Sequence, residues 1–597
     1  MRPAKHIYDE KTIRYRHNLK LLTKFLKKHI YLIAAAMAMY VFFYDLLDSW
    51  SGYYLDGDGY TRALRVYHWL LAPSFWEQPL YESNYPFGAV SHWTRPMDII
   101  WILFTLPFRF YDNLKEIVYI SGAFIAPCLG VLTVLTFVYG LQRVFNIYLV
   151  FVGCYFLLTD TSILSYILPS RPDHHALMLL LSAYGEALIL CWLKKRHDRY
   201  LRILGIISAL MVFTVAEGLL IYALFISFFL YLYIFKNISM QPIIKISKYF
   251  ALALTIFWLS NPPYEGWFYP DNGRLSILYV AASWLALIGF KILDISRLHT
   301  LLIKLLCLWS IALGFALTLT VIFGPDIFSF PVDKELQPIF HSRISEYRSL
   351  KQSSICFAIS AWLYPLIAIL LSLYMLKFRP YKRLMILNLC LGLPLLLISL
   401  YMHRFLNYEH LYIILPFLAL LDHLYKKSDF YKNKNLEFPG YIYGIILLIV
   451  AIQIGVKMPR QLEIANRSRT IVFTSEICQK VKAIGGTLAT DVFLSPEYVW
   501  QCNVNTVGTC YHKNREGILD THKLLTAETA GEAIPLILKH QITQILLFDD
   551  YAKDYYKMDE KNQNKLYYRL LKKENLPPFV EPVPTISSKA HLYKIKI

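Results

Sequence analysis

The sequence carries little charge for its length. Asp, Glu, Lys and Arg make up 17% of its 597 residues, whereas 56% are hydrophobic and 16% are aromatic. A soluble globular protein carries about 25% charged residues, so the composition excludes a soluble fold for most of the chain. It indicates a multi-pass membrane protein instead.

Cysteine pairs of the kind that bind zinc are also absent. None of the nine cysteines stands in a Cys-x-x-Cys spacing, which removes the usual zinc and redox motifs. Cys502 and Cys510 lie in the polar C-terminal region, where they could pair if that region faces an oxidising compartment. Six others fall within apolar runs and are expected to pack as small hydrophobic residues: Cys128, Cys154, Cys191, Cys307, Cys356 and Cys390.

A cleavable signal peptide is not evident either. Residues 1–28 hold nine Lys or Arg and no apolar stretch, so we predict a basic cytoplasmic N-terminus and expect the first span to direct insertion. The formal net charge of +19 would suggest nucleic acid if the cations shared one soluble face. They cluster instead in short segments between apolar runs, as in cytoplasmic loops. We therefore expect no nucleic-acid partner.

Thirteen apolar runs are long enough, or nearly so, to cross a bilayer, which needs about 20 residues per helix. With a cytoplasmic N-terminus, thirteen spans place the basic loops, such as 194–202 and 377–383, on one side. A fourteenth run, 97–111, is short and holds a Pro and an Arg, so we interpret it as interfacial or re-entrant. The thirteen runs lie near 29–48, 117–141, 145–160, 174–193, 201–216, 218–235, 247–260, 275–293, 300–323, 355–376, 383–401, 408–424 and 440–456.

This topology divides the chain into two structural parts. Residues 29–456 are predicted to form an all-α transmembrane domain of about 13 helices, whose outer loops include 49–116 and 324–354. Residues 457–597 alternate strand-like and helix-like patterns, which indicates a small α/β domain. We expect this domain to lie outside the cytoplasm, on the same face as the outer loops.

Four polar motifs fall on the outer face. The first is Asp56-Gly57-Asp58-Gly59-Tyr60, and the second is Asp173-His174-His175 at the outer start of a span. A carboxylate and an imidazole two residues apart can bind a divalent ion, with Asp58 supplying a further oxygen. The third motif contains Glu346, in the outer loop before a span. The fourth contains Arg404 at the outer edge of a span, where a guanidinium can bind a lipid phosphate.

Each motif also has a plain structural interpretation. Asp-Gly pairs are ordinary turn chemistry, and Asp is favoured at helix N-termini. Glu346 lies among Arg and Lys residues, as in a surface salt bridge of little energetic value. An isolated Arg404 is typical of a membrane anchor whose head reaches back to water.

Taken in this order and on one face, the four motifs resemble those of the catalytic subunit of oligosaccharyltransferase, a thirteen-span glycosyltransferase of the GT-C class. Gly57-Asp58-Gly59-Tyr60 matches its Asn/Gly-Asp-x-Tyr motif, and Asp173-His174-His175 matches the Asp-x-His of archaeal members. Ile344-Ser345-Glu346 resembles its Thr-Ile-x-Glu motif, and Arg404-Phe405 resembles the Arg-Phe beside the donor pyrophosphate. The resemblance covers about residues 29–456.

The resemblance implies transfer of a sugar or oligosaccharide from a polyprenyl-(pyro)phosphate donor to an acceptor. It implies a divalent ion, Mn²⁺ or Mg²⁺, held by Asp58, Asp173 and His175. Asp58 and Glu346 would be the catalytic carboxylates, with Glu346 on the acceptor or metal side, and Arg404 would bind the donor phosphate. The chemistry fits a surface site, because expelling a phosphate needs a Lewis acid and a carboxylate inside hydrocarbon is costly.

Four further side chains are expected near this site. Asp56 and His174 lie next to predicted metal ligands in the sequence. Each either holds a ligand in position without binding the ion itself or faces solvent. His92 and Arg95, in the segment HWTRPMD, could contact the donor phosphate or brace Asp58. The alternative is an interfacial belt with Trp93.

One departure leaves the acceptor open. The family's Trp-Trp-Asp-Tyr-Gly motif, which grips the Ser or Thr of the acceptor sequon, is absent after the last span. The acceptor is therefore a protein or a glycan, and a GT-C enzyme that moves a sugar from a polyprenyl monophosphate to a lipid or glycan is an alternative. A transporter or flippase is less favoured, because the spans hold few carboxylates; Glu186 and Glu217 are the two that lie in or beside the middle runs of the chain. In a bacterium, the site would face the periplasm from the inner membrane.

Overall fold

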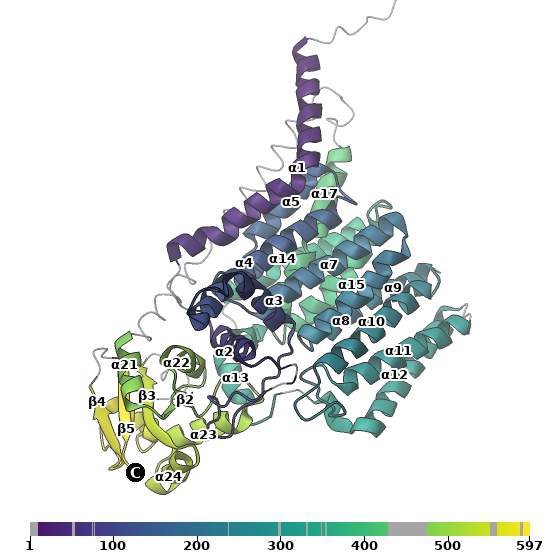
Figure 1. Cartoon of the computed structure of the whole chain (residues 1–597). Helices are drawn as coiled ribbons and strands as arrows, with labels where there is room; N and C mark the ends of the chain where they lie inside the picture. Colours follow the sequence, from purple (N-terminus) through teal and green to yellow (C-terminus); the bar gives the residue numbers. More distant parts are fainter. Residues whose placement is uncertain are drawn as a thin grey trace, which may run out of the picture.

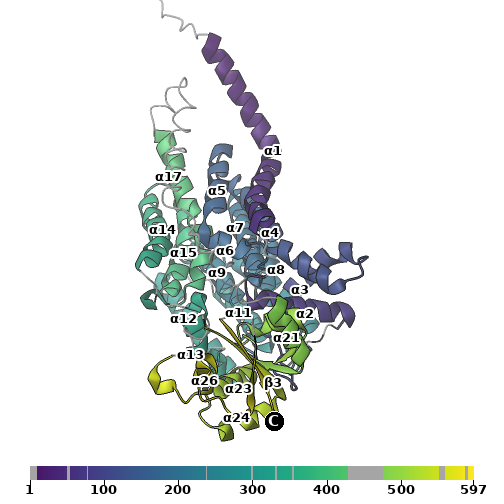
Figure 2. The ribbon, with the colours of Figure 1, turned by 90° about the vertical axis from the view of Figure 1, so that its left-hand side faces the viewer.

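The computed structural model describes residues 10–49, 54–74, 76, 78–236, 238–296, 300–329, 332–347, 349–352, 355–427, 475–549, 558–584 and 589–597. A large bundle of helices lies above a small domain of strands and helices at the C-terminus (Figure 1). The view turned by 90° shows the same order, with the C-terminal domain beneath one end of the bundle (Figure 2).

Eight of the described helices are long and apolar enough to cross a membrane, or nine when the bent pair α5–α6 counts as one span. The protein is an integral multi-pass membrane protein. Twelve of the thirteen predicted runs coincide with described helices, and the last, 440–456, lies outside the described residues. The count of thirteen is not reached by these helices and stays a prediction. The bundle helices are α1 (Glu10–Ser49), α4 (Leu114–Leu141), α5 (Ile147–Thr159), α6 (Thr161–Ile167), α7 (His174–Lys195), α8 (Asp198–Thr214), α9 (Gly218–Lys236), α10 (Gln241–Ser260), α11 (Ile277–Ile295), α12 (Leu301–Phe323), α14 (Ile355–Met375), α15 (Lys382–Ser399), α16 (Arg404–Tyr412) and α17 (Ile414–Lys427).

Helix α7 lies in the interior of the bundle and runs between its two ends. It is apolar on all sides, as expected for a buried helix, and 83% of its apolar stretch is buried, against 6% for the peripheral α12. Asp173 caps its N-terminus and Arg196 ends it in a left-handed conformation with φ of 53°. Its 22 residues extend over about 33 Å, close to the roughly 30 Å of a hydrocarbon core.

The loops that are predicted to face outwards form short helices, which lie against the end of the bundle at the N-terminus of α7. The first contains α2 (Gly57–Leu71), α3 (Pro96–Thr105) and the 3-10 turn η1 (Leu106–Phe108). Helix α3 is too short to cross, as the interpretation of 97–111 as interfacial requires. The loop before α14 contains η2 (Pro325–Phe328), α13 (Gln337–Arg343), η3 (Ser345–Tyr347) and η4 (Leu350–Gln352).

The C-terminal domain is built on a five-stranded mixed sheet in the order β2–β1–β3–β5–β4, which confirms the predicted α/β domain. Strands β2, β1 and β3 are parallel, whereas β5 pairs antiparallel with β3 and β4. The seven-residue β3 is almost entirely buried, as its apolar sequence requires. The elements are α21 (Ser475–Ile484), β1 (Thr487–Ala489), α22 (Ser495–Cys502), β2 (Asn505–Thr506), α23 (Arg515–Thr526), α24 (Ala530–Lys539), β3 (Ile542–Phe548), η5 (Glu560–Asn562), α26 (Leu566–Lys572), β4 (Val580–Val583) and β5 (Ala590–Ile595).

A disulfide in this domain corrects one prediction. Cys502 bonds to Cys478, not to Cys510. The bond joins α22 to α21, whose cysteine Cα atoms lie 5.4 Å apart, within the range that a disulfide allows. Cys510 is a buried free thiol, because its segment leaves the sheet and packs against α2 of the first outer loop.

Candidate active site

The first motif forms a helix N-terminus rather than a solvated turn. Asp56 caps α2, and its Oδ1 accepts a hydrogen bond of 3.0 Å from the Gly59 N–H. Gly57 leaves room for the C-terminal domain, since a Cβ there would lie 3.1 Å from the Phe493 carbonyl and 3.3 Å from the Cys510 sulfur. The lack of a side chain at Gly57 therefore allows the segments around Phe493 and Cys510 to pack closely against the start of α2.

Asp58, in the first turn of α2, meets this C-terminal segment directly. Tyr511 donates a hydrogen bond of 3.1 Å to its Oδ1, and the Cys510 thiol lies 3.7 Å from the same oxygen. Burial, and then the negative charges of Asp56 and Asp173, raise the pKa of Asp58 to about 7. The carboxyl group is thus poised between its protonated and ionised forms near neutral pH.

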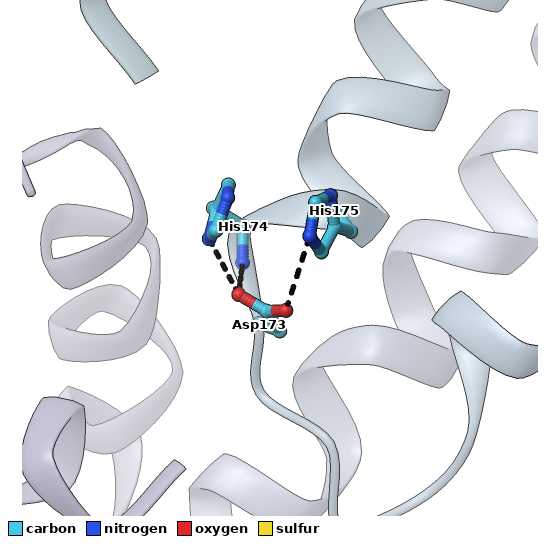
Figure 3. Close-up of side chains that lie close together, drawn as sticks. All are labelled: Asp173, His174 and His175. Atoms are coloured by element: carbon cyan, nitrogen blue, oxygen red, sulfur yellow. Dashed lines mark hydrogen bonds and ion pairs between the residues drawn. The ribbon is translucent and has the colours of Figure 1, made fainter. Parts of the chain in front are cut away.

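The second motif gathers at the N-terminus of α7 (Figure 3). The ligand-capable atoms of Asp173, His174 and His175 lie within 4.8 Å of one another, and all three residues are buried. Asp173 Oδ1 lies 2.5 Å from His174 Nδ1, and Asp173 Oδ2 lies 3.7 Å from His175 Nε2. The predicted flanking residue His174 is therefore part of the cluster itself. The convergence of Asp58 on this cluster stays a prediction.

His175 is held rigidly by aromatic side chains. Its ring stacks on Tyr166 at 4.3 Å, and its Nδ1 hydrogen-bonds to the Tyr408 hydroxyl at 2.7 Å. These contacts leave Nε2 directed at Asp173 and Glu346, the latter at 3.5 Å. An imidazole fixed through one nitrogen, with the other directed at carboxylates, is the arrangement expected of a metal-binding histidine.

Glu346, in η3, is the shared partner of three cationic groups. Its carboxylate lies 2.9 Å from Arg171, 3.5 Å from His175 and 3.9 Å from Arg404. Burial alone would raise the pKa of Glu346, but these three groups outweigh it and hold the pKa well below its ordinary value. Glu346 is thus ionised within the site, which the interpretation as a simple surface salt bridge does not describe.

Arg404, at the start of α16, points into the same cluster. Its Nη1 lies 2.6 Å from Glu217, its Nη2 lies 3.3 Å from His175 Nε2, and its guanidinium lies 5.3 Å from the Tyr347 ring. Its side chain is only 12% exposed. The interpretation of Arg404 as a membrane anchor that reaches back to water is therefore wrong.

Arg171 is a site residue that the sequence analysis missed. It lies 3.3 Å from Asp56, 2.9 Å from Glu346 and 4.0 Å from Asp173. Arg171 thus joins the first, second and third motifs through one guanidinium. The sequence feature that could have identified Arg171 is its position two residues before Asp173, in SRPDHH.

His92 and Arg95 occupy different surroundings. The His92 ring lies 4.3 Å from the ring of His512, in the segment that carries Tyr511. Arg95 pairs with Asp98 at 3.2 Å and stacks on Trp69. Arg95 therefore braces the buried Asp98 rather than Asp58, whereas His92 lies at the contact between the first outer loop and the C-terminal domain.

The C-terminal segment was also missed as part of this site. Besides the contacts to Asp58 and His92, Lys513 forms an ion pair of 2.5 Å with Asp271, in the connection between α10 and α11. Tyr511 packs edge-on against Trp93 with ring centroids 4.6 Å apart. Tyr511, His512 and Lys513 follow GTC in the sequence, and no local motif marks them.

Comparisons with known proteins agree with this architecture. No protein-family model and no curated protein matches the sequence. Among solved structures, the chain is similar to the archaeal oligosaccharyltransferase AglB of Archaeoglobus fulgidus in complex with an inhibitory peptide and a dolichol-phosphate. The TM-score is 0.69 at 13% identity, over 94% of this chain and 80% of the other.

Two further structures of the same archaeal enzyme are also similar to this chain. One is tethered to an acceptor peptide containing the sequon NVT, with a TM-score of 0.67 at 13% identity over 96% of this chain and 75% of the other. Another is a complex with Zn and sulfate, with a TM-score of 0.62 at 12% identity over 89% and 70%. Over nearly its whole length, the chain thus has the fold of an archaeal oligosaccharyltransferase, the fold that its four motifs had predicted.

Proposed function

We propose that the protein is a membrane glycosyltransferase of the oligosaccharyltransferase type. It transfers a sugar or oligosaccharide from a polyprenyl-(pyro)phosphate donor to an acceptor and depends on a divalent ion. The neighbouring structures with dolichol-phosphate, acceptor peptide and Zn support each part of this proposal.

The observation that carries the proposal is the meeting of Arg171, His175 and Arg404 at Glu346. These residues come from α7, α16, η3 and the connection between α6 and α7, and they meet at the N-terminal end of α7. A structural salt bridge needs one cation, whereas this site holds ionised carboxylates, imidazoles and guanidinium groups in one buried place. Such a mixture is typical of sites that bind a metal and a phosphate together.

The residues present fit a divalent ion. Asp173, His174 and His175 offer oxygen and nitrogen ligands, which suit Mn²⁺ and Zn²⁺ as well as Mg²⁺. The buried Nε2 of His174 has no hydrogen-bond partner among the described residues. Asp58 and Glu346 would complete the ligand set. A bound ion would supply Lewis acidity beside the leaving phosphate.

The remaining side chains hold donor and ion in place. Arg404 would bind phosphate oxygens with its planar fork, with Glu217 fixing the orientation of the guanidinium at 2.6 Å. Arg171 would fix Asp56 and Glu346 relative to each other. Tyr511 orients the Asp58 carboxylate from the C-terminal domain.

The acceptor side is where this chain departs from the family motif. With Trp-Trp-Asp-Tyr-Gly absent, we propose that residues 510–513 take part in acceptor selection, because they lie against Asp58 and His92. The acceptor is a protein or a glycan. The outer face is supported by the Cys478–Cys502 disulfide, which suits an oxidising compartment.

The competing functions are supported less. A polyprenyl-monophosphate sugar transferase needs neither a second Asp-x-His motif nor an arginine for a pyrophosphate, yet here both lie in one cluster. The transporter interpretation relied on carboxylates within spans, and one of the two, Glu217, belongs to this same cluster.

The test is a deletion of this protein in its host, followed by analysis of outer-face glycoconjugates. We expect one class of glycoconjugate to disappear and to return with the wild-type chain but not with Asp58→Ala at equal expression. An unchanged set of glycoconjugates in the deletion strain would rule out the proposed activity.

A further inference from the structure

A second polar pocket lies at the opposite end of α7 from the candidate active site. It is a cavity of about 480 Å³ between the end of α7, the start of α8, the connection from α9 to α10 and the start of α15. Because α7 has 22 residues, about 33 Å separates its two ends. The pocket therefore lies near the other surface of the membrane.

The charged groups of this pocket are mainly cations. Arg196, Lys245 and Arg383 line it, together with Asp198. Asp198 is already paired with Lys245. In the part of the chain that the structure describes, no carboxylate lies within ion-pair distance of Arg196 or Arg383. Two exposed arginines thus border one open pocket, and neither has an ion-pair partner among the described residues.

The two arginines differ in their effect on helix stability, because Arg196 lies at the C-terminal end of α7, where the helix dipole favours a cation. Arg383 lies in the first turn of α15, and a cation at a helix N-terminus is unfavourable because it faces the positive end of the helix dipole. Arg196 stacks on Trp192 at 4.1 Å, which fixes its guanidinium beside the cavity. Burial and the charge of Arg383 lower the pKa of Arg196, so an anion between the two would relieve a real repulsion.

The walls of the pocket suit a molecule with both a phosphate and an apolar part. Trp192 and Leu201 are buried wall residues, and Ile238 and Pro242 extend the apolar lining. The planar guanidinium group of an arginine can bind two phosphate oxygens at once. Basic pockets between membrane helices, at headgroup depth, are the usual sites for anionic lipid headgroups.

We propose that this pocket binds the phosphate headgroup of an anionic membrane phospholipid, held between Arg196 and Arg383. The site is separate from the candidate active site, and the inference does not depend on the proposed glycosyl transfer. Free inorganic phosphate shares the same chemistry, and the experiment separates the two sources.

The test compares lipid binding by the purified full-length chain and a charge-matched pair of variants. Native mass spectrometry would measure retention of phosphatidylglycerol and phosphatidylcholine. Arg196→Ala/Arg383→Ala removes the pocket cations. The control, Arg199→Ala/Arg379→Ala, removes two exposed arginines that do not line the pocket, and Arg199 hydrogen-bonds to Tyr200 instead.

We expect the pocket variant to bind phosphatidylglycerol at least about tenfold more weakly, from the loss of charge-assisted hydrogen bonds. The control should match the wild type, and phosphatidylcholine binding should not change. Equal losses in both variants, or no loss in either, would overturn the proposal. Displacement of phosphatidylglycerol by millimolar inorganic phosphate would overturn the lipid source in favour of free phosphate.

A measurement on the wild type removes any dependence on how the variants fold. A photoreactive phosphatidylglycerol should crosslink to the end of α7, the start of α8 or the connection from α9 to α10. Crosslinks found only elsewhere on the protein would contradict the assignment.

Discussion

Arginines line both ends of α7, and the two ends differ in what those arginines face. At the outer end, Arg171 and Arg404 share Glu346, and each has a second carboxylate partner in Asp56 or Glu217. At the other end, Arg196 and Arg383 line a cavity in which the one acidic lining residue is held by Lys245. The outer cations are neutralised and fixed by the protein itself. Arg196 and Arg383 have no carboxylate partner among the described residues, which leaves both guanidinium groups available to an anionic ligand.

This difference separates two uses of charge, one half-buried at the first end and one exposed at the other. A site that carries out chemistry needs its groups held in place before the substrate arrives, and carboxylate partners provide that order. A site that only binds an anion can leave its cations uncompensated, because the ligand completes the charge. The following predictions test whether the two ends are as different as their contacts indicate.

The largest expected effect is on sidedness, because labelling by an impermeant reagent is all or none. Asn113→Cys, at the outer end beside α4, should react in intact cells, whereas Arg379→Cys, before α15, should react only after the membrane is opened. Both positions are exposed. The opposite pattern would invert the topology, and labelling of both from outside would show that the two residues lie on one side.

Asp173→Ala should reduce transfer by at least about 100-fold, the upper range seen when the surroundings of a metal ligand are removed. Asp173 joins His174 and His175 in the ligand cluster. The measurement is the initial rate with saturating donor, together with Mn²⁺ affinity. Asp198→Ala, at the start of α8 near the other end of α7, is the matched control and should retain at least half of the rate. Full activity of Asp173→Ala would show that transfer does not depend on a metal site at this end of α7.

Arg404→Lys should raise the apparent KM for the donor by about 10- to 100-fold, since hydrogen bonds to charged groups contribute about 1.5–3 kcal/mol. A lysine keeps the charge but cannot hold two phosphate oxygens in a fork. The loss should appear in KM if Arg404 binds donor and transition state equally, and in kcat if it mainly stabilises the departing phosphate. Donor kinetics equal to the wild type would argue against phosphate binding by this residue.

Tyr511→Phe should have the smallest effect, about 2- to 10-fold, because it removes one hydrogen bond. The Tyr511 hydroxyl opposes the upward shift of the Asp58 pKa, which lies at about 7. Without it the pKa rises further, so less Asp58 is ionised at a given pH, and only the ionised form binds a cation. The Mn²⁺ concentration for half activity should therefore increase more at pH 6.5 than at pH 8. An increase that is the same at both values would assign Tyr511 a purely structural role.

The sequence predicted the bundle well because long apolar runs have few alternative structures in a membrane. Twelve of thirteen runs coincide with described helices. The predicted residues Glu346, His175 and Arg404 do meet, since each follows or precedes a span on the same face. The sequence left open the pairings that depend on distant contacts: Cys502 bonds to Cys478 and not to Cys510, and Arg95 pairs with Asp98.

The sequence by itself determined that the chain crosses the membrane repeatedly. It also predicted which loops share a face and which carboxylates and imidazoles lie there. Hydropathy and loop charge act locally, so they can be read without coordinates. Only the tertiary structure decided that Arg171 links three motifs and that Tyr511, 453 residues after Asp58, donates to it. It also decided that Arg196 and Arg383 face one cavity. Such contacts depend on how helices and the C-terminal domain pack, and no local pattern specifies packing between segments so far apart.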